Sequence, residues 1–235
     1  VVSVAGNISH RQVVQELEIL CEGWGAGITP SATPFTHAQL APQVQVEYRK
    51  TEQAHLSIAV PGLPLDHSDQ YALDLINVLL GEGMSSRLFI ELREKRGLAY
   101  DIHSSVVHFL DCGAFVISAG VDPRQIYDAV QVILEQMIAV KEGISDEELE
   151  KAKRLVIGRF LLHLEDTRVI SSWMGNQELL LGRNAGIDEV MVRVNSVSTD
   201  DVHKVASDLM LTQNLNLAVV GPVRGHRRLE RLIHL

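Results

Sequence analysis

The chain has 235 residues, of which 46% are hydrophobic and 5% aromatic, so it is long enough to bury a core without disulfide or metal support. Its 30 acidic and 21 basic residues give a net charge of −9, which argues against the nucleic-acid backbone as its main partner. No uninterrupted apolar run of about 18 residues predicts a membrane span. The two cysteines, Cys21 and Cys112, are too few for a disulfide framework and indicate a reducing compartment. We expect the cytoplasm, with the periplasm or an organellar matrix left open, and neither nucleic acid nor a membrane as partner.

Residues 1–40 are interpreted as the end of one unit followed by a linker. Residues 1–6 have the composition of a strand, and Ser9 is placed to cap an amphipathic helix from His10 to Cys21. Periodicity then stops at Gly23-Trp24-Gly25-Ala26-Gly27 and at the prolines Pro30, Pro34 and Pro42. The chain opens inside a strand-like run, without Met or a signal segment, so we expect a fragment or a processed chain. Residues 1–40 would be the last strand and helix of an N-terminal half-domain plus the linker.

Residues 43–121 predict strands and helices in succession. Two strand-like segments fill residues 43–60, and the turn Pro61-Gly62-Leu63-Pro64 leads to a helix that Asp66 or Ser68 is expected to cap. This helix ends at Gly81-Glu82-Gly83. A second helix is expected over residues 85–95, and strands at 100–109 and 113–121 then predict a hairpin.

The rest of the chain is expected to be mainly helical. Pro123 suits the first turn of a helix that runs to about Lys141, and Ser145 and Glu148 form a predicted capping box. Helices at 171–181 and 198–209 and a strand at 216–220 follow, while Arg224, Arg227, Arg228 and Arg231 are expected to form a solvated helix face, with contact to a partner as the alternative. The order predicts an α+β fold in which an antiparallel or mixed sheet packs against helices, with residues 41–235 as one C-terminal half-domain.

Arg93 and Tyr100 are the main candidates for chemistry. They lie seven residues apart with the helix stop Gly97 between them, which can bring both to one side of a cleft. A permanent cation beside an uncharged hydroxyl donor suits a substrate carbonyl or its developing oxyanion. The residues alone leave a structural alternative open, in which Arg93 caps local carbonyls and Tyr100 is half-buried at a strand edge.

The run Gly-Met-Ser-Ser-Arg-Leu-Phe…Leu-Arg-Glu-Lys-Arg-Gly-Leu-Ala-Tyr, residues 83–100, resembles the second half of the pitrilysin/insulinase (M16) zinc peptidases. The branch it resembles most contains the mitochondrial processing peptidase and its bacterial relatives. Three further segments agree in the same order: Thr-Glu-Gln-Ala-His-Leu (51–56), Pro-Gly-Leu-Pro (61–64) and Asp-Glu-Glu-Leu-Glu-Lys-Ala-Lys (146–153). The resemblance implies a metallopeptidase half-domain of the LuxS/processing-peptidase type that encloses a chamber with a second, similar half.

The same resemblance implies roles for particular residues. Arg93 and Tyr100 would position the substrate, and Gly81 and Gly83 would correspond to a glycine-rich substrate-binding loop, although a helix C-cap with a tight turn explains these glycines equally well. The family holds its zinc in the first half, on a His-x-x-Glu-His motif and a distal Glu.

This chain is expected to bind no metal itself. No two of its 10 histidines are four residues apart, so the His-x-x-Glu-His motif is absent. His103 and His108 would face opposite sides of a strand, which makes them a poor ligand pair. Zinc is therefore expected in the full-length enzyme and not on this chain.

These observations predict the substrate-positioning half of a zinc-dependent metalloendopeptidase that is inactive alone. Its expected partners are a peptide or unfolded segment and a zinc-bearing N-terminal half or homologous subunit, in a homo- or heterodimer. The alternative is a noncatalytic family member that serves as a partner or scaffold subunit, like the core proteins of the respiratory cytochrome complex. Such relatives usually lose the Arg/Tyr pair, so Arg93 and Tyr100 favour the peptidase. A peptide-binding module that works without zinc is a third reading.

Overall fold

The computed structural model describes the chain except residues 26 and 29–31, so Ala26 and Pro30 of the expected linker lie outside the described residues. Contacts divide the chain into two units, which we call the helical unit (Val1–Phe35 with Gly158–Gly186) and the sheet unit (Thr36–Ile157 with Ile187–Leu235). None of the described helices combines the length and the apolarity that a membrane crossing requires.

The sheet unit is built on one mixed five-stranded sheet in the order β1-β5-β2-β4-β3. The strands are β1 (Gln43–Tyr48), β2 (Ala54–Gly62), β3 (Ala99–His108), β4 (Gly113–Val121) and β5 (Asn216–Gly221). β1 and β5 run parallel, and the other neighbours are antiparallel. The predicted α+β fold and the hairpin of β3 and β4 are therefore confirmed.

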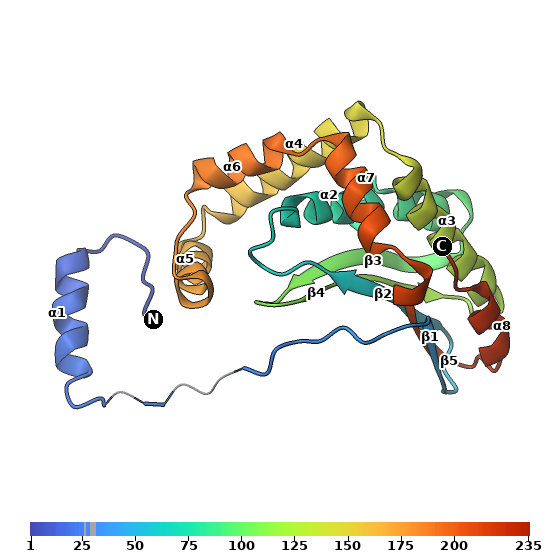
Figure 1. The fold of residues 1–235 in the computed structure, drawn as a ribbon, viewed down its shortest axis with the longest axis horizontal. Coiled ribbons are helices and arrows are strands. Elements are labelled where there is room, and N and C mark those ends of the chain that lie inside the picture. Colours follow the sequence, from blue (N-terminus) through green and yellow to red (C-terminus); the bar gives the residue numbers. More distant parts are fainter. Residues whose placement is uncertain (26, 29–31) are drawn as a thin grey trace. The chain divides into compact units, whose positions relative to one another are not determined.

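One face of the sheet forms the core because apolar residues alternate along the strands. In β2, Leu56, Ile58 and Val60 are at most 2% exposed, whereas the alternate residues His55, Ser57 and Ala59 are exposed or half-buried. The helices α2 (Gln70–Gly81), α3 (Ile126–Glu142) and α7 (Thr199–Leu209) lie over this face (Figure 1). The opposite face carries short and polar side chains, so it is the face of the sheet unit on which a polar ligand can lie.

The start of α2 and the helix after it differ from expectation. The N-cap of α2 is Asp69 instead of Asp66 or Ser68, and its carboxylate accepts a hydrogen bond from Lys204 of α7 at 2.8 Å, not from the helix backbone. The helix expected over residues 85–95 forms as a π-helix, η1 (Phe89–Lys95). Its buried residue Leu92 lies four residues after Leu88, the buried residue at its N-cap, a spacing that fits an α-turn and the wider π-turn equally.

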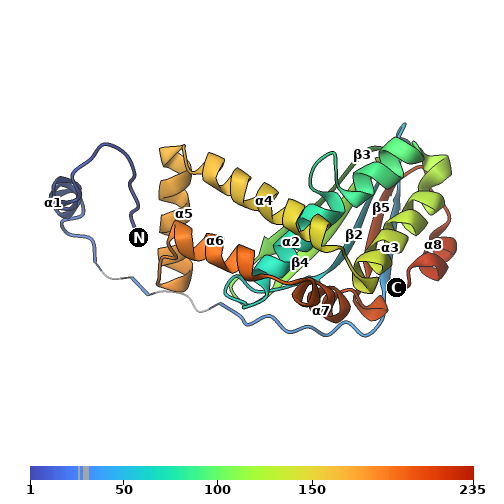
Figure 2. The ribbon, with the colours of Figure 1, turned by 90° about the horizontal axis from the view of Figure 1, so that it is seen from above.

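Most of the remaining helices of the sheet unit are predicted from the sequence, but the helix Ile187–Ser196 is not. A 3-10 turn, Pro123–Gln125, precedes α3, and the predicted capping box of Ser145 with Glu148 forms before α4 (Asp146–His163). A second capping box, of Ser198 with Asp201, forms before α7. α6 (Ile187–Ser196) lies beside α4 (Figure 2), where the buried Lys153 donates a hydrogen bond to the Asn195 carbonyl at 3.1 Å. α8 (His226–Leu232) packs against β1 and α3.

The helical unit contains α1 (His10–Leu20), the end of α4 and α5 (Thr167–Leu181). The strand expected at residues 1–6 is wrong, because no described strand pairs with this segment, and Ser3 instead lies against Gly175 of α5. Ser9 is at the N-cap of α1, but its side chain makes no capping bond. Phe160 and Trp173 pack edge to face with ring centroids 5.3 Å apart.

Candidate functional site

Tyr100 lies at a β-bulge where β3 begins. Ala99 pairs with Val121 and Asp101 with Gly120, so two residues of β3 span one step of β4 and Tyr100 is the extra residue. Its side chain is 58% exposed, and within the described part of the chain its hydroxyl forms no hydrogen bond. A bulge turns a side chain out of the regular alternation of a strand, so Tyr100 is presented to solvent with a free donor.

Arg93 lies on η1, which leads through Gly97 directly into β3. Gly97 has a φ of +60°, a left-handed conformation that ends the helix. The Arg93 guanidinium is 5.1 Å from the centroid of the Phe89 ring, one turn earlier, and it has no carboxylate partner among the described residues. Arg93 and Tyr100 form no bond with each other, so each keeps its donors available for a ligand.

A polar hollow of about 210 Å³ lies on the open face of the sheet, where β2 begins and β4 ends. His103 pairs across β3 and β4 with Ser118, which pairs in turn with Ser57 of β2. The two serine hydroxyls are 3.0 Å apart, and the Nδ1 atom of His103 is 3.3 Å from the Asp101 carboxylate. His55 and Gln53 complete the polar rim.

The hollow is lined by Asp101, the residue that follows Tyr100 in β3, and not by Tyr100 itself. The hydroxyl, imidazole and amide groups of the hollow can donate to and accept from a peptide backbone. From the sequence, His103 is considered only as a metal ligand and residues 51–56 only as a family-like segment, and these residues are not joined in one site. The alternation of Asp101, His103 and Ser105 with core residues in β3 is a local signal that could have found part of the set.

Gly81 and Gly83 have different roles in the structure. Gly81 ends α2 in the core, and a Cβ atom there would lie 2.5 Å from the backbone nitrogen of Ser104 in β3. Gly83 has a φ of +96°, and its carbonyl accepts a hydrogen bond from the Ser86 hydroxyl at 2.7 Å. Gly81 thus permits close packing of α2 on β3, and Gly83 shapes the turn that leads to η1.

An ion pair holds this turn to α4. Arg87 donates two hydrogen bonds to Glu148, both of 3.0 Å, beside a small cleft of about 50 Å³. The Arg87 guanidinium is the main cause of the lowered pKa of Glu148, and the backbone and hydroxyl of Ser145 contribute. Glu148 therefore caps α4 and also binds Arg87 through two hydrogen bonds, which fixes the segment that leads to Arg93 against α4.

The histidines of β3 face opposite sides of the sheet, as predicted. His103 borders the open hollow, whereas His108 faces α2, with Nδ1 2.7 Å from the Leu63 carbonyl oxygen and Nε2 3.3 Å from the Asp74 carboxylate. Both nitrogens of His108 face acceptors, and the bond to Asp74 is the main cause of its raised pKa. The described residues contain no group of three His, Cys, Asp or Glu side chains that could hold a metal ion.

Residues 1–156 match the model of the peptidase M16 inactive domain. The chain belongs to the peptidase M16 family. This M16 domain is 38% identical over 231 residues to an uncharacterized zinc protease of Streptomyces coelicolor, a match that covers 95% of the chain and 50% of that protein. It spans about half the length of the curated relatives it matches.

Solved structures share the fold of the M16 domain at low sequence identity. A protease from Helicobacter pylori superposes with a TM-score of 0.83 at 21% identity, covering 93% of this chain and 54% of that one. A chain of complex III2 from Candida albicans superposes with a TM-score of 0.83 at 18% identity, covering 98% of this chain and 57% of that one. At these identities the likeness establishes the α+β fold and nothing about activity.

Proposed function

We propose that this M16 domain is the peptide-positioning half of a zinc metalloendopeptidase and that Arg93 and Tyr100 contact the peptide. The names of its curated relatives imply zinc. The described residues of this chain do not fit a zinc ion, since no three suitable ligands lie together. The zinc therefore belongs to a second half or homologous subunit, in a homo- or heterodimer, and the role of this chain is to bind and orient the substrate.

The observation that carries the proposal is the arrangement at the start of β3. Tyr100 is turned out of the strand by a bulge, and Arg93 lies free on the helix that leads into it. A guanidinium and a hydroxyl donate to a peptide carbonyl oxygen, and such donors stabilise negative charge that develops on it. Neither side chain donates a hydrogen bond to a carbonyl or carboxylate oxygen of the described residues.

The surroundings suit an extended peptide. β3 is an edge strand, so one side of its backbone is open to strand addition. The polar hollow, lined by Asp101 next to Tyr100 in the chain, can take a polar side chain of the same peptide. We propose peptides and unfolded segments as the substrate class, and the cytoplasm as the compartment, because Cys21 and Cys112 are both free thiols.

The test uses the full-length protein, in which this domain is paired with the half proposed to carry zinc, and first measures its zinc content and peptidase activity. We expect Arg93→Ala and Tyr100→Phe each to lower kcat/KM for a quenched unstructured peptide by roughly 10²-fold to 10³-fold. Arg96→Ala is the matched control, because Arg96 is an exposed arginine three residues along the chain whose ion pairs lie with Glu91 and Glu135. Unchanged turnover in the Arg93 and Tyr100 variants would contradict the assignment. If the paired protein binds no zinc and cleaves no peptide, the noncatalytic partner or scaffold role replaces the proposal.

A further inference from the structure

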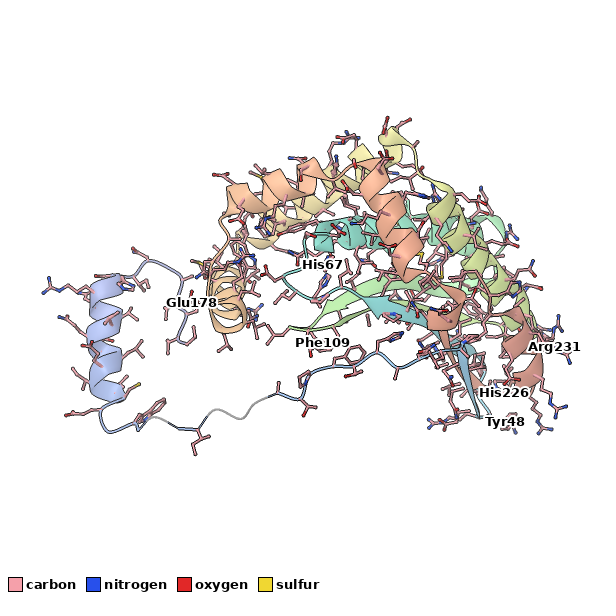
Figure 3. The ribbon with its side chains drawn as sticks, in the orientation of Figure 1. Tyr48, His67, Phe109, Glu178, His226 and Arg231 are labelled. Atoms are coloured by element: carbon pink, nitrogen blue, oxygen red, sulfur yellow. The ribbon has the colours of Figure 1, made fainter. Side chains whose placement is uncertain are left out.

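A cluster of cations lies at one end of the sheet unit, far along the chain from the proposed peptide site. We call it the basic face; it consists of Arg49, Lys50, Arg224, Arg227, Arg228 and Arg231, all exposed. Figure 3 shows Tyr48 at the end of β1 close to His226 and Arg231 of α8. The backbone nitrogen of Arg49 donates to the Gly221 carbonyl at 3.0 Å, which joins the two segments into one surface.

The charge of the basic face contrasts with the rest of the molecule. Residues 47–50 and 222–235 contain six arginines and lysines and two glutamates, a net charge of +4, so the remainder of a chain of charge −9 carries −13. Both glutamates are already paired, Glu47 with Arg49 at 2.8 Å and Glu230 with His226 at 3.3 Å. The face is thus a local positive pole on an acidic protein.

Four of its five arginines lack carboxylate partners, the exception being Arg49, although acids are in excess over the whole chain. Within the described part of the chain, Arg224, Arg227, Arg228 and Arg231 form no ion pair, whereas Arg87, Arg124 and Arg193 elsewhere each pair with an acid. Two of the four instead lie over tyrosine rings, Arg224 at 4.9 Å from the Tyr48 centroid and Arg228 at 3.9 Å from that of Tyr127. Stacking orders these guanidinium groups while their N–H edges remain open for bidentate contacts.

We propose that the basic face binds an acidic, Asp/Glu-rich segment of a partner protein. Ordered arginines and exposed tyrosine are the residue types that dominate protein interfaces, and unpaired guanidinium groups match carboxylates. A membrane or a nucleic-acid duplex presents an extended array of phosphates, which would also meet the acidic remainder of the chain and be repelled by it. A short acidic segment matches the charge of the face and can bind it without meeting the acidic remainder of the chain. This inference does not depend on the proposed peptidase role.

The test measures fluorescence anisotropy of a labelled Glu-rich peptide with the chain, and of the same peptide with Gln in place of Glu. We expect the Glu-rich peptide alone to bind, with a Kd that rises with salt concentration. Arg227→Glu with Arg231→Glu should weaken binding by at least about tenfold, because two attractions become two repulsions. Lys151→Glu with Arg154→Glu on α4 changes the net charge by the same amount and should alter the Kd by less than about twofold. Far-UV circular dichroism checks that both double variants fold.

Three results would overturn the proposal. The first is that the Glu-rich peptide fails to bind. The second is equal weakening by the two double variants, which would show that net charge and not this face attracts the peptide. The third is tighter binding of a DNA duplex or of phosphatidylserine vesicles than of the peptide, which would assign the face to phosphate groups.

Discussion

Gly81→Ala should destabilise the sheet unit, although alanine favours a helix over glycine. The added methyl group would lie 2.5 Å from both the backbone nitrogen and the Oγ atom of Ser104 and 2.7 Å from its Cβ atom. Ordinary carbon contacts begin near 3.5 Å, so α2 and β3 must separate by roughly 1 Å. The Ser104 hydroxyl is itself held by the carbonyl and side-chain oxygens of Asn77, at 3.0 and 2.6 Å, which limits the room to adjust.

The size of the effect follows from two opposing contributions. Overpacking against backbone costs about 3 kcal/mol, at the upper end of its usual range because no flexible side-chain tip can move aside. The higher helix propensity of alanine offsets about 1 kcal/mol, which leaves a net loss of about 2 kcal/mol in the free energy of unfolding.

Gly158→Ala is the matched control. Gly158 also lies in a helix, α4, but a Cβ atom there meets nothing within 4 Å. The Gly158→Ala variant should gain up to about 1 kcal/mol in the free energy of unfolding from helix propensity alone. Urea unfolding followed by far-UV circular dichroism compares both variants with the wild type. A midpoint for Gly81→Ala at or above that of the wild type would refute the packing argument and return Gly81 to the substrate-loop role that family resemblance implies.

Two further predictions concern ion pairs. The pKa of His108 is raised in the folded protein above about 6.5, its value in the unfolded chain. The bond with Asp74 therefore stabilises the fold fully below about pH 6.5, and this stabilisation is lost as the pH rises through the folded pKa. The difference in urea-unfolding midpoint between the wild type and Asp74→Asn should therefore shrink between pH 6 and pH 9. A difference that stays constant over this range would contradict the reasoning. Glu148→Gln should lower the free energy of unfolding by about 1 kcal/mol at pH 7, because it weakens the bond to Arg87 and the cap of α4. The control Glu147→Gln, at the neighbouring residue, should leave the free energy of unfolding unchanged. Because the pKa of Glu148 is lowered in the folded protein, the stability difference between the wild type and Glu148→Gln should be present above about pH 4.5. It should disappear as the pH falls through the folded pKa of Glu148, and the same urea assay measures it.

Much of the sheet unit could be predicted because its signals are local. Alternation in β2, the apolar stripe of α3 and the two capping boxes each lie within one element. The failures involve distant partners. Residues 1–6 have a strand composition but no described strand to pair with, and Asp69 rather than Asp66 or Ser68 begins α2, with its carboxylate bonded to Lys204, 135 residues later.

The candidate site shows the same limit. Arg93 and Tyr100 could be named from their spacing and from resemblance, but the bulge that exposes Tyr100 is a property of register between β3 and β4. The polar hollow joins Ser57, His103 and Ser118 from three strands, and only the pairing of those strands places them in one row. A pattern read along one strand identifies which residues share a face and not which strand lies beside it.

The place of β5 in the sheet has a consequence for synthesis on the ribosome. β5 lies between β1 and β2, yet it begins at Asn216, after every other strand has been made. At about 5 to 20 residues per second, the roughly 150 residues between β2 and β5 take about 8 to 30 s to translate. During that interval β2 can pair with β4, but its other edge has no partner, and β1 has none at all. Nascent chains therefore expose an apolar strand edge for seconds, a period in which a chaperone or a neighbouring nascent chain can bind there before β5 does.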